Sequence, residues 1–232
     1  NVTVQNSTAT SLQGGSFAGG LVGCGADVNI ENVTVENTEV SATSYADVST
    51  FEAVGGLGGK LCGSVNGATV NNVKLETVGA AGGLVGYVCG DESLVLSNAQ
   101  MIADINADFA GGAVGKIDNP ALIKISDISV GGNISGERYE AGIAAVVESA
   151  SSDFDVSQLR TPMISNAVIG AKINGGNAAI VIGDASETVF TGKVNTYTDV
   201  FTNVYYSSYQ NALPAFATGA INAYQSAEYL VN

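Results

Sequence analysis

The sequence contains no histidine and no tryptophan, and it has only 3 cysteines among 232 residues. Without histidine, the cysteines cannot complete a Cys/His zinc cluster or a Cys/His dyad, so neither a metal site nor thiol catalysis is expected. The 8 Lys and Arg are scattered singly against 22 Asp and Glu, and the net charge is −14. Nucleic acid is therefore not an expected partner. No apolar run reaches the roughly 18 residues that a membrane span needs. We expect no cofactor and no membrane-spanning segment.

What the chain does contain is a glycine-rich segment that recurs at nearly even intervals. Clear copies begin at Gly19, Gly55, Gly82 and Gly111, and weaker copies begin at residues 141 and 178. The intervals between these starts are 36, 27, 29, 30 and 37 residues. A period of about 20 to 50 residues is typical of a solenoid, a propeller or another repeat array. Glycine fits a tight corner that returns once per repeat, because it tolerates positive φ and close backbone approach.

The second half of each repeat alternates apolar and polar residues around an Asn or Asp, as in Ile30-Glu-Asn-Val-Thr-Val35. Short alternating runs rich in Val and Ile indicate β-strands rather than helices. The aligned polar positions are Asn32, Asn72, Asn98, Asp127, Asn166 and Asn203. We interpret them as a stacked, architectural column at a second corner, because Asn ladders stabilise in-register strands.

These patterns predict an all-β parallel β-helix or closely related β-solenoid of about six coils over residues 1–206. A propeller is the alternative, but its blades are usually about 40 residues or longer and often carry Trp-Asp signatures.

Residues 207–232 are predicted to form a C-terminal cap or junction, since tyrosines crowd this end of the chain. The alternative role for those tyrosines is to bind sugars by stacking. Residues 1–6 align with residues 32–37, so we expect a chain cut within a repeat from a longer array.

Cys62 and Cys89 occupy equivalent positions in two neighbouring repeats, so we expect them to lie side by side. Coils about 4.8 Å apart would place the pair within the Cα range of a disulfide, although parallel side-chain directions do not favour the bond. Two buried thiols and a disulfide both remain open. Cys24 has no equivalent partner and is interpreted as a core or corner residue.

The Gly-Gly-Leu-Val-Gly copies, each followed by an Asn-Val-x-Val strand, resemble the GLUG repeats of bacterial surface proteins. The resemblance covers residues 19 to about 206. It implies an extracellular location, on the cell surface or secreted, and a role as a stalk or adhesive module. It implies no catalytic residue, because the residues of the motif are structural.

An enzyme of the polysaccharide-cleaving β-helix type, or a polysaccharide-binding one, is the main alternative. Such a site would need two facing carboxylates. The acids weighed for it, and for a calcium site, are Asp104, Asp108, Asp127, Asp153, Asp155, Asp184 and Asp199. They fall one per repeat or in variable loops with few basic neighbours, so a solvated acidic surface is the preferred interpretation.

Two insertions lengthen the repeats at residues 41–51 and 149–162. Insertions in a solenoid emerge as loops on one face, which is often the binding face; a loop without a partner is the alternative. Tyr and Arg dominate interface hot spots, so the candidate contacts are Tyr45, Phe51, Arg138, Tyr139, Phe154 and Arg160. The sequence thus predicts a non-enzymatic stalk and adhesin whose partner is a host glycan or matrix protein, or a plain spacer.

Overall fold

The computed structural model describes residues 1–12, 15–43, 51–88, 93–119, 122–148, 163–185, 201–207, 213, 216–219 and 228–229. Within these ranges the chain is all-β and contains no α-helix, as the sequence predicts. The same ranges hold no helix that is long and apolar enough to cross a membrane.

The four longest strands are β4 (Val22–Glu36), β7 (Gly58–Thr77), β10 (Leu94–Gly111) and β12 (Ile123–Ala141). The strands before β7 are β1 (Val2–Gln5), β2 (Thr8–Ser11), β3 (Phe17–Gly19), β5 (Glu39–Ala42) and β6 (Ala53–Gly55). The short strands between β7 and β14 are β8 (Ala80–Gly82), β9 (Val85–Val88), β11 (Val114–Ile117) and β13 (Ala144–Val147). The last are β14 (Ile164–Ile169), β15 (Lys172–Asn174), β16 (Ala178–Ala179), β17 (Ile182–Ala185), β18 (Phe201–Tyr206), β19 (Phe216–Gly219) and β20 (Glu228–Tyr229).

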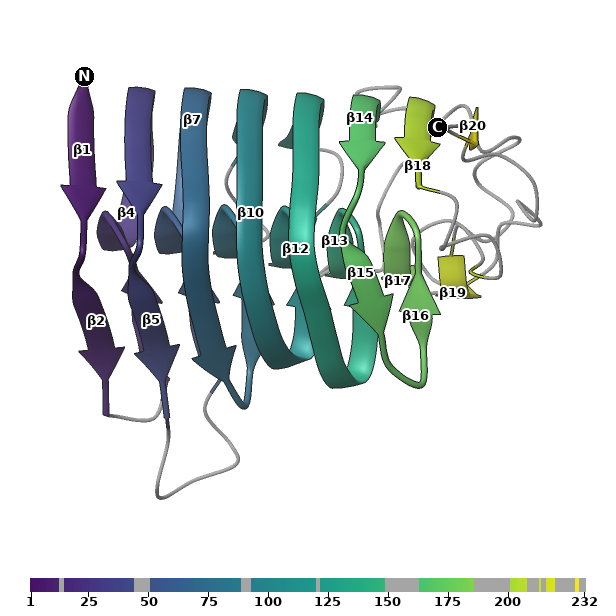
Figure 1. The fold of residues 1–232 in the computed structure, drawn as a ribbon, viewed down its shortest axis with the longest axis horizontal. Helices are drawn as coiled ribbons and strands as arrows, with labels where there is room; N and C mark the ends of the chain where they lie inside the picture. The colour runs from purple at the N-terminus through teal and green to yellow at the C-terminus, as the bar shows by residue number, and fades with distance from the viewer. Residues whose placement is uncertain are drawn as a thin grey trace.

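All strand pairs are parallel, and each strand pairs with the equivalent strand of the next turn. Along one side the order is β1, β4, β7, β10, β12, β14 and β18, which lie side by side along the long axis in Figure 1. The molecule is a parallel β-solenoid of about four turns, so the predicted fold is confirmed but the predicted number of about six coils is not. Residues 44–50, 149–162 and 186–200 fall outside the described part.

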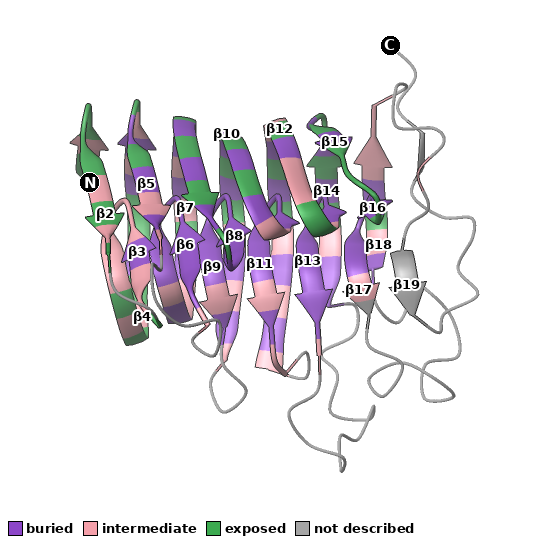
Figure 2. Ribbon diagram, turned by 90° about the horizontal axis from the view of Figure 1, so that it is seen from below, coloured by how far each residue is buried: buried purple, intermediate pink, exposed green. Residues whose placement is uncertain are grey.

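The interior is built from columns of apolar side chains that repeat from turn to turn. One column runs through Val35, Val70, Met101, Val130 and Ile169, each of which is in register with the next and at most 1% exposed. Figure 2 shows the resulting alternation of buried and exposed residues along the strands. Because each apolar residue stacks on an apolar residue of the next turn, the turns share a core that none could close alone.

The two glycines of each repeat serve different contacts. A Cβ on Gly82 would lie 2.0 Å from the carbonyl oxygen of Val85, so the first glycine permits the tight corner. A Cβ on Gly83 would lie 2.0 Å from Cε of Met101, so the second leaves room for the apolar column. Neither glycine has positive φ. Close approach, rather than an unusual backbone conformation, therefore explains the recurring Gly-Gly. Gly19, Gly55, Gly82 and Gly111 are in register with one another.

Candidate functional site

The long strands bend at residues with left-handed backbone conformation, which form a column along the solenoid. Asn98, Asp127, Asn166 and Asn203 have φ of 50°, 55°, 53° and 53°, and each is in register with the next. Asn203 Nδ2 donates to Asn166 Oδ1, and Asn166 Nδ2 donates to Asp127 Oδ1, each at 2.9 Å. Asn and Asp tolerate this conformation better than other residues with a Cβ. The same residues thus bend the strands and tie the turns together.

Asn72 does not lie in this column, although the sequence alignment placed it there. The pairing of β4 with β7 puts Gly67, with φ of 74°, beside Asn32, and puts Asn72 beside Asn37. Asn72 Nδ2 donates to Asn37 Oδ1 at 2.7 Å. Asn72 is also the extra residue of a β-bulge, since Asn71 and Val73 pair with consecutive residues of β10. The alignment was wrong because glycine can take the left-handed position as well as asparagine can.

A second column faces outward on the short strands and their neighbours. Cys24, Lys60, Tyr87 and Lys116 are in register on β4, β7, β9 and β11. Cys24 is exposed there, so the prediction that it could be a core residue is wrong. Cys62 is 1% exposed, and its Sγ lies 3.7 Å from the carbonyl oxygen of Gly25. Cys89 lies outside the described residues, so both alternatives for this pair, two buried thiols and a disulfide, stay predictions.

Aromatic rings gather around this column. The Phe17 and Tyr87 rings are nearly parallel, with centroids 6.1 Å apart, and Phe51 meets Tyr87 edge-on at 4.9 Å. Lys60 Nζ lies 5.9 Å from the Phe17 centroid and 6.0 Å from the Tyr87 centroid, so it contacts both rings through cation–π interactions. Phe51 is the residue that follows the undescribed 44–50 segment. The first insertion therefore returns to the solenoid at this cluster.

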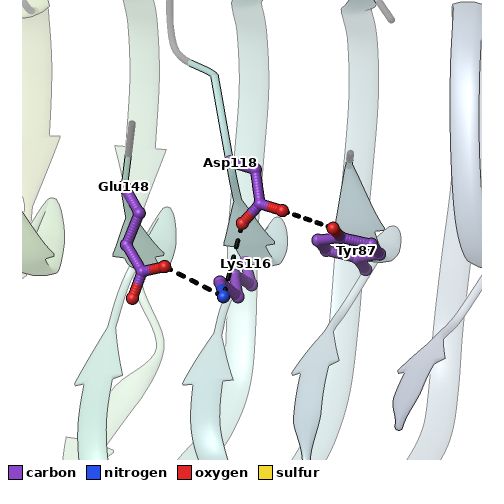
Figure 3. Close-up of polar contacts among 4 residues, drawn as sticks. All are labelled: Tyr87, Lys116, Asp118 and Glu148. Atoms are coloured by element: carbon purple, nitrogen blue, oxygen red, sulfur yellow. Dashed lines mark hydrogen bonds and ion pairs between the residues drawn. The ribbon is translucent and has the colours of Figure 1, made fainter. Parts of the chain in front are cut away.

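A group of charged residues adjoins the rings (Figure 3). Lys116 Nζ lies 3.3 Å from Asp118 Oδ1 and 3.0 Å from Glu148 Oε2, and the Tyr87 hydroxyl donates to Asp118 Oδ2. Lys116 Nζ also lies 5.1 Å from the centre of the Phe51 ring. Burial alone would lower the pKa of Lys116, but its hydrogen bond to Glu148 and the charges of Asp118 and Glu148 outweigh burial and raise that pKa. Lys116 therefore keeps its positive charge, and its ammonium group is held between the carboxylates of Asp118 and Glu148.

We call this cluster the aromatic–ionic surface. It consists of Phe17, Phe51, Lys60, Tyr87, Lys116, Asp118 and Glu148.

A second aromatic group lies in the register column of Phe17. There the Phe109 and Tyr139 rings stack with centroids 6.3 Å apart, and Arg138 Cζ lies 4.9 Å from the Phe109 centroid. Both groups offer ring faces and edges beside charged groups, which suits ligand binding.

The predicted contact residues fall into both groups. Phe51 belongs to the aromatic–ionic surface, and Arg138 and Tyr139 to the second aromatic group. Tyr45, Phe154 and Arg160 lie outside the described residues. Tyr87 and Phe109 were not among the predicted contact residues. Tyr87 sits beside a repeat motif that was interpreted as architectural, and only the register of the turns brings it to Phe17 and Phe51.

The acids weighed for catalysis occupy separate surroundings. Asp104 Oδ1 accepts from Asn133 Nδ2 at 2.7 Å, while Asp127 belongs to the Asn column. Burial and the charge of Glu137 raise the pKa of Asp108, and Arg138 lowers it in part. Asp153, Asp155 and Asp199 lie outside the described residues. In the part of the chain that the structure describes, no three His, Cys, Asp or Glu residues are grouped to hold a metal ion.

Comparison with protein-family models, with curated proteins and with solved structures gives no match. The class of this protein therefore rests on its own structure, which is that of a parallel β-solenoid.

Proposed function

We propose that the chain is a non-enzymatic repeat module of the bacterial cell surface or a secreted protein, which serves as a rigid stalk and carries an adhesive surface. The observation that carries this proposal is the aromatic–ionic surface, held on an uninterrupted stack of paired strands. The resemblance to GLUG repeats is the basis for the extracellular location and for the bacterial source. A host glycan or an extracellular matrix protein is the proposed partner.

Rigidity follows from the way the turns are joined. The β10 strand pairs with β7 over 11 residues and with β12 over 16, so a hinge between these turns would break many backbone hydrogen bonds together. The apolar column from Val35 to Ile169 also crosses the junctions between β4, β7, β10, β12 and β14. A ligand-binding surface on such a stack stays at a fixed distance and orientation. Weak contacts on several such modules would then add through avidity.

The aromatic–ionic surface is suited to contact a partner because its side chains are already ordered. Tyr87 touches Phe17, Phe51 and Asp118, and Lys116 is held by two carboxylates. Binding to a preordered surface loses less side-chain entropy than binding to free side chains. Aromatic residues in such settings often dominate binding energy.

The test is a glycan and matrix-protein array probed with the wild-type chain and with Phe51→Ala and Tyr139→Ala. Specific binding that weakens about tenfold or more in either variant supports the proposal, since hot-spot truncations cost about 2 kcal/mol or more. Ile102→Ala is the matched control, because Ile102 is an exposed apolar residue, 55% accessible, outside both aromatic groups. Binding that is unchanged in both variants would reject the two aromatic groups as the adhesive surface. No binding at high protein concentration would reject the adhesive role and leave a spacer.

A further inference from the structure

A groove lined by both polar and apolar residues runs across the turns on β7, β10, β12 and β14, separate from the aromatic groups. It is an open hollow of about 480 Å³. The lining side chains that matter here are Thr69, Asn98, Gln100, Asp127, Ser129 and Asn166.

The groove follows from the left-handed column. Each strand bends where its Gly, Asn or Asp takes positive φ, and the bends at Gly67, Asn98, Asp127 and Asn166 are in register. A bend in one strand alone would leave a small depression, whereas bends in register on neighbouring strands extend this depression from turn to turn. Adjacent strands lie about 4.8 Å apart, so the lining repeats at that spacing.

Some hydrogen-bonding groups of the lining have no partner among the described side chains. Asn98 Nδ2 donates to Asn66 Oδ1 at 2.7 Å, away from Asp127. Among the described residues, no side-chain hydrogen bond joins Asn98 to Asp127, so the ladder is interrupted in the middle of the groove. Asn98 and Asp127 are both exposed, and their side-chain oxygens Asn98 Oδ1 and Asp127 Oδ2 have no side-chain hydrogen bond to a described residue, so both can accept from ligand hydroxyls.

An aromatic residue continues one side of the groove. Thr69, Gln100, Ser129, Val168 and Tyr205 form a single register column through β7, β10, β12, β14 and β18. Val168 is 41% exposed. A ligand that lies along the groove would meet amides and hydroxyls first, then an apolar side chain and a tyrosine. This combination suits a sugar chain, because the polar edges of a pyranose can bond to amides and hydroxyls and its apolar C–H faces can pack on an aromatic ring.

We propose that the groove binds a linear, neutral glycan whose chain lies parallel to the solenoid axis. Asp127 is the only charged residue in the described lining, and the chain carries a net charge of −14, so an acidic polysaccharide is disfavoured. An extended peptide has no free strand edge to pair with here, because β7, β10, β12 and β14 are each paired on both sides. The inference goes beyond the proposed function: it concerns another surface and stands even if the aromatic–ionic surface binds nothing.

The experiment titrates the ¹⁵N-labelled chain with cellohexaose, mannohexaose and chitohexaose, with hexagalacturonate as the charged comparison. The expected result is binding of at least one neutral hexasaccharide with a Kd of about 1 mM or lower. Amide shifts should centre on residues 67–69, 98–100, 127–129 and 166–168. No binding of any neutral probe, shifts centred elsewhere, or equal binding of hexagalacturonate would overturn the proposal.

Two variants locate the bound glycan. Gln100→Ala and Tyr205→Ala should each weaken binding about three- to tenfold, as expected for the loss of one hydrogen bond or one stacking contact. Asn106→Ala is the matched control, because Asn106 is exposed on the same strand but outside the groove. Thermal unfolding checks that each variant is folded. Unchanged affinity in both groove variants would overturn the proposal, as would a loss confined to Tyr139→Ala, which would assign the glycan to the second aromatic group.

Discussion

The Glu140 carboxyl group occupies the space that a side chain on Gly175 would take: a Cβ at residue 175 would lie 2.0 Å from both Cδ and Oε2 of Glu140. Glu140 is fully buried, in a column where the neighbouring turns place Ala110 and Ala178. Neither carboxylate oxygen makes a hydrogen bond of good geometry with a described residue. An acid thus stands where the repeat otherwise places alanine, and a glycine in the next turn accommodates it.

Gly175→Ala should destabilise the fold, because the new methyl group and the Glu140 carboxyl cannot share one space. We expect a loss of about 1 to 3 kcal/mol, as for other overpacked sites. In Gly175→Ala/Glu140→Ala the clash is gone, so the double variant should be more stable than Gly175→Ala alone. Denaturant unfolding of the four proteins of this cycle gives the coupling energy. Additive effects of the two substitutions would contradict the contact.

Glu140→Gln should stabilise the chain above acidic pH. Burial raises the pKa of the Glu140 carboxyl, and the backbone N–H of Asn177 lowers it only in part. A raised folded pKa means that the contribution to stability is fully present below the ordinary glutamate pKa of about 4.3 and is lost as pH rises through the folded value. Wild type and variant should therefore unfold alike near pH 3.5, and the variant should have the higher Tm at pH 7. Glu137→Gln, at an exposed position of the same strand, is the control. Equal Tm values at pH 7 would show that Glu140 does not bury its charge.

The repeats could be predicted from the sequence because their chemistry recurs. Gly82 and Gly83 meet a carbonyl oxygen and an apolar side chain that every turn presents, so the same residue types return at the same interval. Asn72 shows the limit of this reasoning. An Asn in an alternating run fits two columns equally well, and only the pairing of Val70 with Val35 decides between them.

The candidate surfaces were harder to predict, because they depend on contacts between turns at positions that vary. Tyr87 approaches Phe17 and Phe51, which lie 70 and 36 residues earlier in the chain. No local pattern marks such a contact. The burial of Glu140 could not be predicted either, since a single acid in a strand is normally expected at the surface.

Asn166→Ala should destabilise the fold more than Asn166→Gly. Both variants lose the hydrogen bonds to Asp127 and from Asn203, which together contribute about 1 to 3 kcal/mol. Only alanine must also adopt the left-handed conformation, φ 53° at this position, at a further cost of about 1 kcal/mol. Gly67, which occupies the same column, is a natural precedent for glycine. Thermal and denaturant unfolding of the two variants measures the difference. If alanine were tolerated as well as glycine, the backbone conformation would not be what selects Asn here.

Lys116→Met should destabilise the chain at neutral pH by about 1.5 kcal/mol or more, because hydrogen bonds between charged groups are lost and Asp118 keeps a partly buried charge. Burial opposes the charge of Lys116, but Glu148 and Asp118 raise its pKa overall. The stabilisation is therefore fully present below the ordinary lysine pKa of about 10.4 and is lost as pH rises through the raised folded value. Unfolding free energies from pH 7 to pH 11.5 should show the two proteins converging at the alkaline end. Lys74→Met is the matched control: the Lys74–Glu76 pair is more than half exposed, so its loss should cost about 1 kcal/mol or less. A difference between wild type and Lys116→Met that stays constant across this range would mean that Lys116 stabilises the turns by packing on Phe51 rather than by its charge.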